Sequence, residues 1–412
     1  MPFRIISASD RRAVDRLLDR PRRRDRVLDL QVRGIVDRVR KGGDRALRSF
    51  ARRFDRVTGS LEVSAKDLHD GARAVPPDVR RAIREAARHI ADVARRQLPR
   101  TSRTVVGPGV SVEQRVEPLA RVGCYIPGGR FPLPSSLLMT AVPARIAGVG
   151  EIIAVCPRPE PAVMAAALEA GVTRLFRVGG AHAIAALAYG TASVPRVDKI
   201  VGPGNRYVAA AKAYVAADCA IDFYAGPTEI VIVAGGGRPE WIAADLIAQA
   251  EHDPDARPIL ITWKRSLAER VARAIGERAS GLGIARASLR ANGAAIVTRT
   301  LDEAISLSNR IAPEHLVVDR ESIARRPLVA GAVFVGPFAA QAAGDYATGS
   351  NHVLPTSGAS RFRGGLSAAD FVRIMSVQRL TETGLAWLAP TILPLARAEG
   401  LHAHAASIEV RL

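Results

Sequence analysis

From Val122 onward, short apolar runs alternate with alanine-rich segments, and few folds accommodate that order. The runs have the length of strands and lie at 152–155, 175–178, 199–201, 230–233, 259–261, 295–297 and 332–335. Segments typical of helices lie between them, at 162–170, 181–188, 207–217, 241–251, 267–278 and 301–311. This order predicts parallel sheets covered by helices on both faces, with ligands bound in the loops that follow the strands.

The rest of the chain shows weaker patterns. The part before residue 100 is mainly helical in pattern, with one helix over 27–40 and a clearer one after Pro77. On the clearer helix, apolar residues recur every three or four positions and would form one buried stripe of Val79, Ile83, Ala86, Ile90 and Val93. Residues 110–116 alternate like a strand. The segment after residue 366 predicts a helix near 381–398 and a closing strand at 407–411, too little to bury a core of its own.

Length, composition and charge limit the classes of protein to which the chain can belong. With 412 residues, of which 48% are hydrophobic, the chain can form two or more globular domains. The formal charge of +19 could attract nucleic acid, but the arginines are scattered over several predicted helices and aromatic residues make up only 5%. We therefore expect no nucleic-acid partner, and a basic surface that attracts anionic ligands such as a dinucleotide.

The cysteines and the hydropathy pattern predict the cellular compartment of the protein. Cys124, Cys156 and Cys219 form no CxxC pair, which is typical of a reducing environment. The N-terminus has no signal-peptide pattern, and no apolar run approaches the about 20 residues that span a bilayer. We expect a cytoplasmic protein that does not associate with membranes.

A polar stretch late in the chain carries the first candidate ligands. The sequence AGDYATGSNH, residues 343–352, contains Asp345 and His352 among glycines and small polar residues, which favours a loop over a helix or strand. Rigid α/β scaffolds place their chemistry on such loops. A stretch of this kind is more often a solvated turn, so its interpretation depends on its partners.

Two glycine turns are candidates for contacts with a phosphate or a dinucleotide. Gly128-Gly129 ends the run GCYIPGG, and Gly202-Pro203-Gly204-Asn205 directly precedes a predicted helix. Glycines let backbone amides approach a ligand closely, and a helix N-terminus favours an anion. Neither turn has the GxGxxG pattern, so each by itself is also typical of an ordinary turn.

Gln249 and His252 form a candidate metal-binding pair. They are three residues apart at the end of a predicted helix that Pro254 terminates, so their side chains share one face. An exposed polar last turn, with His252 near the negative end of the helix dipole, explains the same residues without a metal.

Glu314 and His315 are a candidate acid/base pair. They are adjacent where a predicted helix gives way to an apolar strand, and an imidazole titrates near neutrality, as a general base requires. The C-terminal stretch EGLHAHA, residues 399–405, is a further loop rich in potential ligands.

Taken in order, these motifs resemble those of the histidinol dehydrogenase family. The matching stretches are RVGCYIPGG, KIVGPGN, AGPTE, QAEHDP, APEHL, GDYATGSNHVLPT and EGLHAHA, and the resemblance runs from about residue 50 to the C-terminus. Seven motifs in one order make a chance match implausible. The resemblance implies oxidation of L-histidinol to L-histidine through the aldehyde, in the last steps of histidine biosynthesis, with two NAD molecules and a bound zinc.

The resemblance also implies a role for each matching residue. One zinc per subunit would be held by Gln249, His252, Asp345 and His404. The acid/base pair would be Glu314 and His315. Substrate would contact Thr228, Gln249, His252, His315, Asp345, His352, Glu399 and His404. NAD would contact Tyr125, His182 and Asn205.

Two positions depart from the pattern of the family. His182 follows VGGA where the family usually has glutamine, which leaves the affinity for NAD open, and Thr228 replaces a serine but keeps the hydroxyl. The implied reaction needs a base for the hydroxyl proton, two hydride transfers and attack of water on the aldehyde. His315 suits the repeated proton transfers and Glu314 the activation of water. A thiohemiacetal on Cys124 is the rival mechanism for the aldehyde step and the less expected one.

We therefore predict an α/β fold of two incomplete Rossmann-like domains, with small helical extensions at both ends, in an intertwined homodimer. Residues 25–126 and 228–366 would form domain 1, with the metal and acid/base residues. Residues 127–227 would form an inserted domain 2 on the NAD side, and 1–24 an N-terminal helical extension. The two glycine turns should face one cleft. In the resembled family the tail crosses to the other chain, so residues 367–412 would bring Glu399 and His404 to the site of the partner subunit.

Three other functions remain open at this point. A paralogue of the same fold could oxidise another small polyol or a sulfonated diol, although the presence of Glu399 and His404 favours histidinol, whose imidazole end they would contact. A basic nucleic-acid-binding protein would need a continuous arginine face. A metal hydrolase would turn over without NAD.

Overall fold

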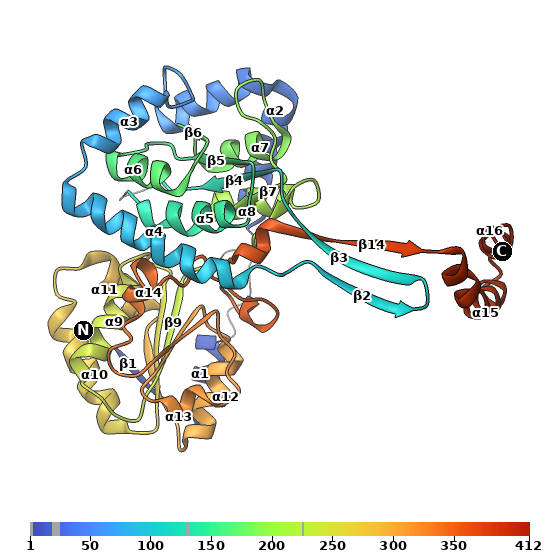
Figure 1. Ribbon diagram of the computed structural model, residues 1–412. Coiled ribbons are helices and arrows are strands. Elements are labelled where there is room, and N and C mark those ends of the chain that lie inside the picture. The colour runs from blue at the N-terminus through green and yellow to red at the C-terminus, as the bar shows by residue number, and fades with distance from the viewer. Residues whose placement is uncertain (1–2, 19–24, 129–131, 225) are drawn as a thin grey trace.

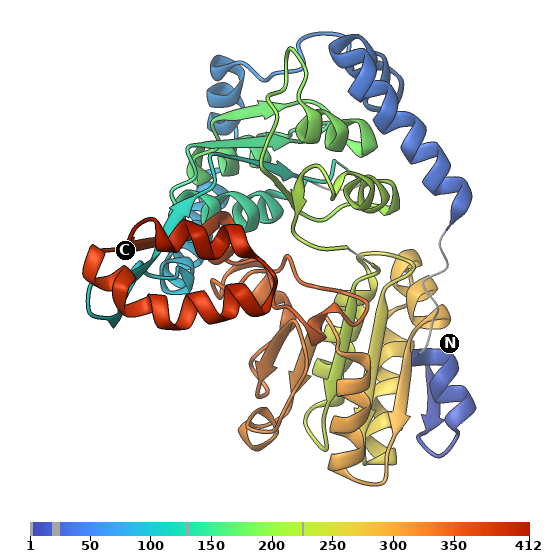
Figure 2. The same ribbon diagram turned by 90° about the vertical axis from the view of Figure 1, so that its right-hand side faces the viewer.

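The computed structural model describes residues 3–18, 25–128, 132–224 and 226–412. The chain forms two domains, each built on a parallel sheet, and an arm that projects from them (Figure 1). Figure 2 shows the two domains one above the other, and they are named here the upper and the lower domain after their place in these views. Among the described residues, no helix is long and apolar enough to cross a membrane.

The lower domain contains a six-stranded sheet in the order β1-β11-β10-β9-β12-β13, with every neighbouring pair parallel. Its strands are β1 (Arg4–Ser7), β9 (Glu229–Val233), β10 (Arg257–Thr262), β11 (Ala294–Val297), β12 (His315–Val318) and β13 (Ala332–Val335). One face is covered by α9 (Pro239–Ala250), α10 (Arg265–Arg278) and α11 (Gly283–Ala291). The other is covered by α1 (Arg11–Leu18), α12 (Leu301–Ile311) and α13 (Glu321–Ala324). Both faces are buried, which explains why the strands are nearly continuous apolar runs.

The upper domain contains a five-stranded parallel sheet in the order β6-β5-β4-β7-β8. Its strands are β4 (Arg121–Tyr125), β5 (Glu151–Val155), β6 (Arg174–Phe176), β7 (Lys199–Val201) and β8 (Ala220–Ile221). On one face lie α3 (Ala65–Arg73), α4 (Pro77–Gln97), α5 (Pro134–Ile146) and α6 (Pro161–Ala170). On the other lie α2 (Arg26–Phe50), the π-helical turn η1 (Ala51–Asp55), α7 (Gly180–Tyr189) and α8 (Arg206–Val215).

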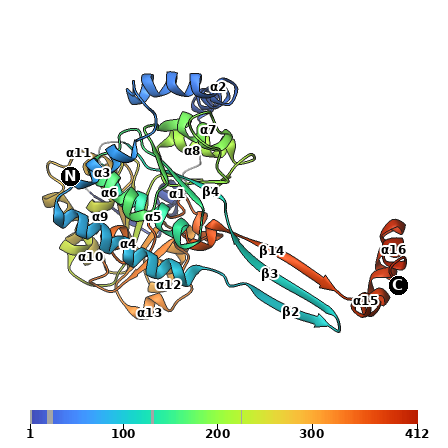
Figure 3. The ribbon, with the colours of Figure 1, turned by 45° about the horizontal axis from the view of Figure 1, so that its top comes forward.

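The arm is an antiparallel ribbon that ends in two helices standing away from both domains (Figures 1 and 3). Its strands, in the order β14-β3-β2, are β2 (Ser102–Gly107), β3 (Val110–Pro118) and β14 (Val372–Leu380), and its helices are α15 (Glu382–Ala398) and α16 (His402–Glu409). Large apolar side chains are exposed along it, including Val105 at 72%, Leu395 at 59% and Val410 at 77%. An apolar surface of this kind is typical of a face that packs on another chain.

The sheets divide the chain differently from the predicted domains. The sequence assigns 25–126 to the same domain as 228–366, but β4 pairs with β5 and β7, and α2, α3 and α4 pack in the upper domain. The lower sheet is built from β1 and from strands between residues 229 and 335. An apolar run indicates that a strand is buried, but the sheet that it joins is decided by tertiary contacts.

Three local predictions are also wrong. The extension 1–24, predicted as helical, does contain the helix α1, but the helix is preceded by a strand, β1, which pairs with β11. The closing strand predicted at 407–411 is replaced by α16, which continues to Glu409. Asp345 lies not in a loop but in the short helix α14 (Gln341–Tyr346), because the helix-compatible residues QAAGDY precede the run of small polar residues.

Candidate functional site

Glu314 is a buried acid of the lower domain. It directly precedes β12, which lies between β9 and β13, and its side chain is 9% exposed. Its Oε2 accepts hydrogen bonds from Thr228 Oγ1 at 2.5 Å and from the Glu229 amide at 2.9 Å. Burial raises the pKa of Glu314 to about 8, although the bond from Thr228 opposes this rise. The carboxyl is therefore largely protonated at neutral pH before any ligand binds.

His315 opens β12 beside this acid and is 3% exposed. Its Nδ1 lies 3.1 Å from the Glu229 carbonyl oxygen. A carbonyl only accepts, so Nδ1 carries the proton and Nε2 keeps its lone pair. Burial lowers the pKa of His315, which favours this neutral form, although Asp345 opposes the shift. Nε2 lies 3.9 Å from Asp345 Oδ1, so its lone pair, which the Gln341 amide also approaches, lies beside a candidate metal ligand.

Asp345 is held by residues on its own helix and on the loop that follows. Gln341, one helical turn earlier, donates from Nε2 to Asp345 Oδ2 at 2.7 Å and approaches His315 Nε2 at 3.3 Å. His352 Nδ1 lies 3.0 Å from the Asp345 carbonyl oxygen and 3.9 Å from its Oδ1. Burial lowers the pKa of His352, and the nearby His315 and His252 lower it further, while Asp345 opposes them.

The loop that carries His352 also contacts the upper domain. Ser136, in the first turn of α5, lies 3.4 Å from His352 Nε2, and Asn351 donates to the Met139 carbonyl at 2.6 Å. The acid/base pair of the lower domain therefore lies next to the strand ends of the upper domain, since α5 follows β4.

Gln249 and His252 occupy different environments. Gln249, in the last turn of α9, is fully buried and donates from Nε2 to Thr228 Oγ1. His252 lies beyond the helix and is exposed. The predicted shared helical face is therefore only partly present, because α9 ends at Ala250.

Two of the predicted residues lie far from the others. Glu399 follows α15 and His404 lies in α16, both at the tip of the arm and both exposed (Figure 1). Within the part of the chain that is described, no group of three or more His, Cys, Asp or Glu side chains could hold a metal. One chain thus brings together Gln249, Asp345, His315, Glu314, Thr228 and His352, with His252 nearby, but not Glu399 or His404.

Gln249 and Asp345 offer donor atoms of a type that zinc accepts, although the described chain by itself does not complete a metal site. Gln249 Oε1 is buried and has no hydrogen-bond partner among the described residues, which is costly unless a ligand uses that oxygen. Gln341 holds Oδ2 of Asp345, which leaves Oδ1 directed at the two histidines. Oxygen and imidazole donors together suit zinc, and an incomplete set leaves positions for a substrate.

The three predicted NAD contacts lie at the carboxyl edge of the upper sheet. Tyr125 ends β4, and its hydroxyl accepts from the Gly180 amide at 3.0 Å. His182, near the start of α7, is 2% exposed, with its Nε2 2.7 Å from Asp55 Oδ2 and its ring beside Phe50 and Phe54. Asn205 caps α8 by accepting from the amides of residues 207 and 208. The side chain of His182 is thus held by Asp55 in the protein interior, whereas Asn205 is exposed to solvent.

The turn before α8 has the features of a dinucleotide subsite. Gly202 has φ +112°, and a Cβ there would collide with the Tyr125 carbonyl oxygen. No acceptor among the described residues bonds the amides of Gly204, Asn205 or Arg206. Free amides at the start of a helix favour an anionic group. Of the other predicted turn, Gly128 packs on Pro157 and Gly129 lies outside the described residues.

Sequence reasoning missed four residues that shape the site. Gln341 and Ser136 contact the histidines, while Asp55 and Glu229 hold other site residues. Two of the four had a signal in the sequence. Glu229 lies within the motif AGPTE, and Gln341 is four residues from Asp345, the spacing of neighbours on one helical face. Ser136 and Asp55 are brought in by tertiary structure, and no local signal marks them.

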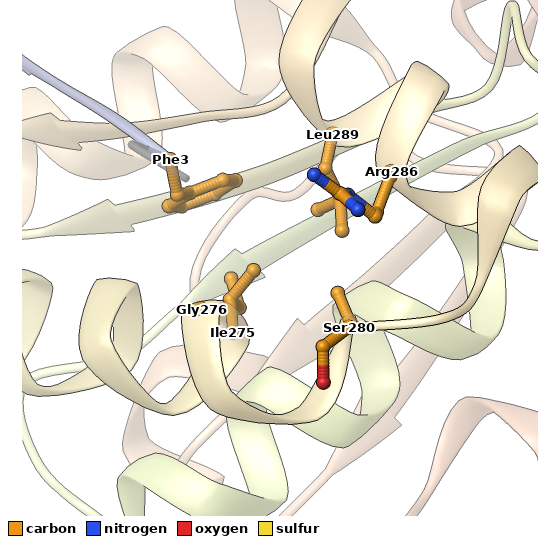
Figure 4. A pocket seen from close by; sticks show the side chains of 7 residues that line it. Phe3, Ile275, Gly276, Ser280, Arg286 and Leu289 are labelled. Atoms are coloured by element: carbon orange, nitrogen blue, oxygen red, sulfur yellow. The ribbon is translucent and has the colours of Figure 1, made fainter.

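The cavity in Figure 4 is separate from this site. It has a volume of about 230 Å³ and is lined by Phe3, Ile275, Gly276, Ala279, Ser280, Arg286 and Leu289. These residues belong to α10, α11 and the segments beside them, so the cavity contributes nothing to the arrangement above.

The stability of the metal-free protein should depend on pH through Glu314. Because burial raises the pKa of Glu314 from 4.5 to about 8, the folded chain holds this proton more tightly than the unfolded chain. The resulting contribution to the free energy of unfolding is fully present below pH 4.5 and is lost as the pH rises through 8. In denaturant titrations, Glu314→Gln should weaken this dependence by up to about 1.4 kcal/mol per pH unit.

Asp245→Asn is the control for this measurement. Burial raises the pKa of Asp245 from 3.8 to about 6, so its replacement should change the dependence only below that pH. If the wild type and Glu314→Gln lose stability equally between about pH 6 and about pH 8, Glu314 is not a buried protonated acid.

Comparisons with known proteins agree on one family. A family model described as histidinol dehydrogenase matches residues 18–412. The histidinol dehydrogenase of Methanothermobacter thermautotrophicus is 45% identical, with 99% of each chain covered. That of Caulobacter vibrioides is 47% identical, with 96% of this chain and 95% of the other covered. The crystal structure of histidinol dehydrogenase from Elizabethkingia anophelis matches with a TM-score of 0.94 and 31% identity, covering 100% of this chain and 98% of the other.

Proposed function

The chain belongs to the histidinol dehydrogenase family, and from that premise we propose how its residues oxidise L-histidinol to L-histidine with one zinc and two NAD. The observation that carries the proposal is the buried His315, whose unprotonated Nε2 lies beside Asp345 while Glu314 adjoins it. A base, a carboxyl and metal ligands are then within reach of one substrate carbon. The net reaction consumes one water and two NAD⁺ and releases two NADH and three protons.

We propose that zinc is held by Gln249 Oε1, His252, Asp345 Oδ1 and His404 of the partner subunit. When bound, zinc would act as a Lewis acid and fix the imidazole and amine nitrogens of histidinol. Thr228 and His352 would contact the substrate from this chain, and Glu399 of the partner subunit would contact its imidazole end. Gln341 supports the set, because it holds Asp345 Oδ2 and leaves Oδ1 free.

His315 and Glu314 divide the proton transfers. His315 Nε2 would remove the hydroxyl proton of histidinol in the first oxidation and a hydroxyl proton of the aldehyde hydrate in the second. Glu314, in its ionised form, removes a proton from the water that attacks the aldehyde. Thr228 donates to Glu314 and orients the carboxyl, and the Glu229 carbonyl fixes the tautomer of His315.

NAD would lie along the carboxyl edge of the upper sheet, against Tyr125, His182 and Asn205. Its phosphate oxygens would accept hydrogen bonds from the free backbone amides at the start of α8, because a helix N-terminus favours an anion. His182 replaces the glutamine that is usual in the family. Because its Nε2 is bonded to Asp55 Oδ2, His182 would contact the cofactor with the rest of its ring. Hydride acceptance is the chemistry that NAD supplies.

The working unit is proposed to be a homodimer with shared sites, in the cytoplasm. Glu399 and His404 stand on an arm with exposed apolar side chains, which supports its packing on a second copy. A twofold dimer would complete two equivalent sites. The three cysteines are free, as is usual in a reducing compartment.

The test of the activity is NADH formation from L-histidinol. We expect two NADH per histidinol, loss of the reaction with a chelator and its recovery on adding zinc. A paralogue acting on another alcohol would oxidise that alcohol faster than histidinol, and turnover without NAD would indicate a hydrolase. Neither result is compatible with the proposal.

Replacing His252 by alanine should remove zinc without unfolding the protein. His252 is exposed and lies beyond α9, so the substitution leaves the core intact and the midpoint of thermal unfolding within about 3 °C for the metal-free proteins. Zinc content, measured by atomic emission after dialysis, should fall from about one per chain to near zero, and turnover with it. Glu251→Ala, next to it on the same turn, should keep both. A zinc-free but fully active His252→Ala protein would disprove the metal set.

Replacing Cys124 by alanine should leave both oxidation steps within about threefold of the wild type. Cys124 is fully buried in β4, and burial raises the pKa of its thiol to about 12, so it is neither accessible nor ionised. The smaller side chain should cost roughly 1 kcal/mol of stability, seen by denaturant unfolding. Selective loss of histidinal oxidation, with histidinol oxidation retained, would restore the thiohemiacetal mechanism.

A further inference from the structure

Beneath the turn before α8 lies an ion pair that no step of the reaction uses. Lys212, in α8, and Asp222, directly after β8, are joined through Nζ and Oδ1, and their side chains are 3% and 0% exposed. Lys212 projects back toward the turn because its position is within two helical turns of the start of α8. A charge pair this deeply buried needs further hydrogen bonds to be compatible with folding.

Those hydrogen bonds go to the backbone of one residue, Gly202, at the start of the turn. Asp222 Oδ2 accepts from the Gly202 amide at 2.8 Å, and Lys212 Nζ donates to the Gly202 carbonyl at 3.1 Å. Both polar backbone groups of Gly202 are therefore held by side chains of opposite charge. The remaining bond to Asp222 Oδ1 comes from the Phe223 amide at 2.6 Å.

Gly202 in turn sets the direction of the turn. Its φ of +112° and its close approach to the Tyr125 backbone require glycine, and the next residues, Pro203 and Gly204, lead directly to the cap Asn205. The free amides of Gly204 and Asn205 therefore take their orientation from Gly202, whose backbone the ion pair fixes. A small rotation of Gly202 would turn both amides away from a common anion.

We propose that Lys212 and Asp222 are positioning residues for the dinucleotide: through Gly202 they hold the amides of the 202–205 turn where a phosphate of NAD is bound. The proposal rests on the cofactor site of the proposed function. Neither side chain touches the cofactor, since both are buried below the turn. The pair therefore governs affinity for NAD and not the chemistry at His315.

The test separates positioning from folding by keeping the buried charge balanced. Lys212→Met alone leaves the Asp222 carboxylate buried without its cation, which destabilises the domain. The double variant Lys212→Met/Asp222→Asn is neutral, keeps an acceptor for the Gly202 amide and removes the donor to its carbonyl. A second double variant, Lys212→Gln/Asp222→Asn, is also neutral but retains a donor. Lys199→Met is the matched control, because Lys199 lies on β7 and bonds Asp370 and not the turn.

NADH binding to the zinc-loaded protein is measured by fluorescence, together with the midpoint of thermal unfolding and the KM values for NAD and L-histidinol. We expect the methionine double variant to bind NADH at least about tenfold more weakly, with KM for NAD raised and KM for histidinol within about twofold. The glutamine double variant should recover part of the affinity, and Lys199→Met should change none of it. NADH affinity within about twofold of the wild type in a folded methionine variant, or equal weakening in both double variants, would overturn the proposal.

Asn205→Ala distinguishes failure of this inference from failure of the cofactor site. Asn205 lies on the turn itself and is exposed, so its loss should weaken NADH binding wherever the proposed site is correct. If Asn205→Ala weakens binding but the methionine double variant does not, only the role of the ion pair is wrong. If neither weakens it, NADH binds elsewhere and the cofactor site fails together with this inference.

Discussion

Turnover of L-histidinol should fall by about 10²- to 10⁴-fold when His315 is replaced by asparagine. The asparagine amide can still donate to the Glu229 carbonyl, as His315 Nδ1 does at 3.1 Å, so the strand and its neighbours should keep their places. What is lost is Nε2, whose lone pair lies beside Asp345 and is proposed to accept the proton in both oxidation steps. Initial rates of NADH formation from L-histidinol and from L-histidinal, each in zinc-loaded protein, should drop together.

Glu314→Gln should give a different pattern from His315→Asn. The amide can accept from Thr228 and the Glu229 amide as the carboxyl does, but it cannot take a proton from water. Histidinal oxidation, which consumes the water, should therefore slow more than histidinol oxidation. Equal slowing of both steps would contradict the division of proton transfers proposed above.

His69→Asn is the matched control for these variants. His69 lies in α3, and its Nδ1 also contacts a backbone carbonyl, that of Ala65 at 2.8 Å, but it is exposed and lies outside the site. Its replacement should leave both rates within about twofold of the wild type. If His315→Asn retained zinc and near-normal rates, another residue would have to be the base.

Mixing two inactive proteins, His315→Asn and His404→Ala, should restore activity once subunits exchange. Each site is proposed to combine the lower domain of one chain with α16 of the other, so one site in a mixed dimer would contain both intact halves. At complete exchange of equal amounts, half of the dimers are mixed and each has one good site, so about a quarter of the wild-type activity should return. The measurement is NADH formation after mild denaturation and dilution, with mixed dimers verified by differently tagged chains.

His402→Ala provides the control on the same helix. His402 begins α16 two residues before His404 and is not among the proposed ligands, so this variant should be active without any mixing. If verified mixed dimers of the first two variants stay inactive, each chain builds its own site. The arm would then have to fold back onto the domains of its own chain.

The sequence predicted most strands of the two parallel sheets but not β1, β4 or β8, and burial explains the difference for the central strands. Strands β9, β10 and β11 are buried on both faces, so each is an apolar run that stands out against its flanking helices. The site residues of the lower domain, including Glu314, His315 and Asp345, come together because they lie at strand and helix ends.

Other features could not be read from the sequence, because they depend on contacts between distant segments. The pairing of β4 with β5 and β7 is one, and the contact of Asp55 with His182, 127 residues apart, is another. The apolar stripe of α4 predicted a buried face but not the domain that it covers. The proposed metal ligands came from the motifs that resemble a known family, because local pattern alone is equally compatible with a metal site and with an exposed turn.

The arm has a consequence for the order in which the protein can fold on the ribosome. Strand β3 is complete at Pro118, yet its long neighbour β14 begins only at Val372, and the two pair along their full length from Val372 with Pro118 to Leu380 with Val110. Until nearly the whole chain has been synthesised, the β2–β3 hairpin has one unpaired edge and exposed valines. Both domains can close before that edge is covered, so the arm must be the last part of the monomer to form. Chains that end before β14 should therefore be soluble only with a chaperone, whereas chains that end after Leu380 should already have a paired arm.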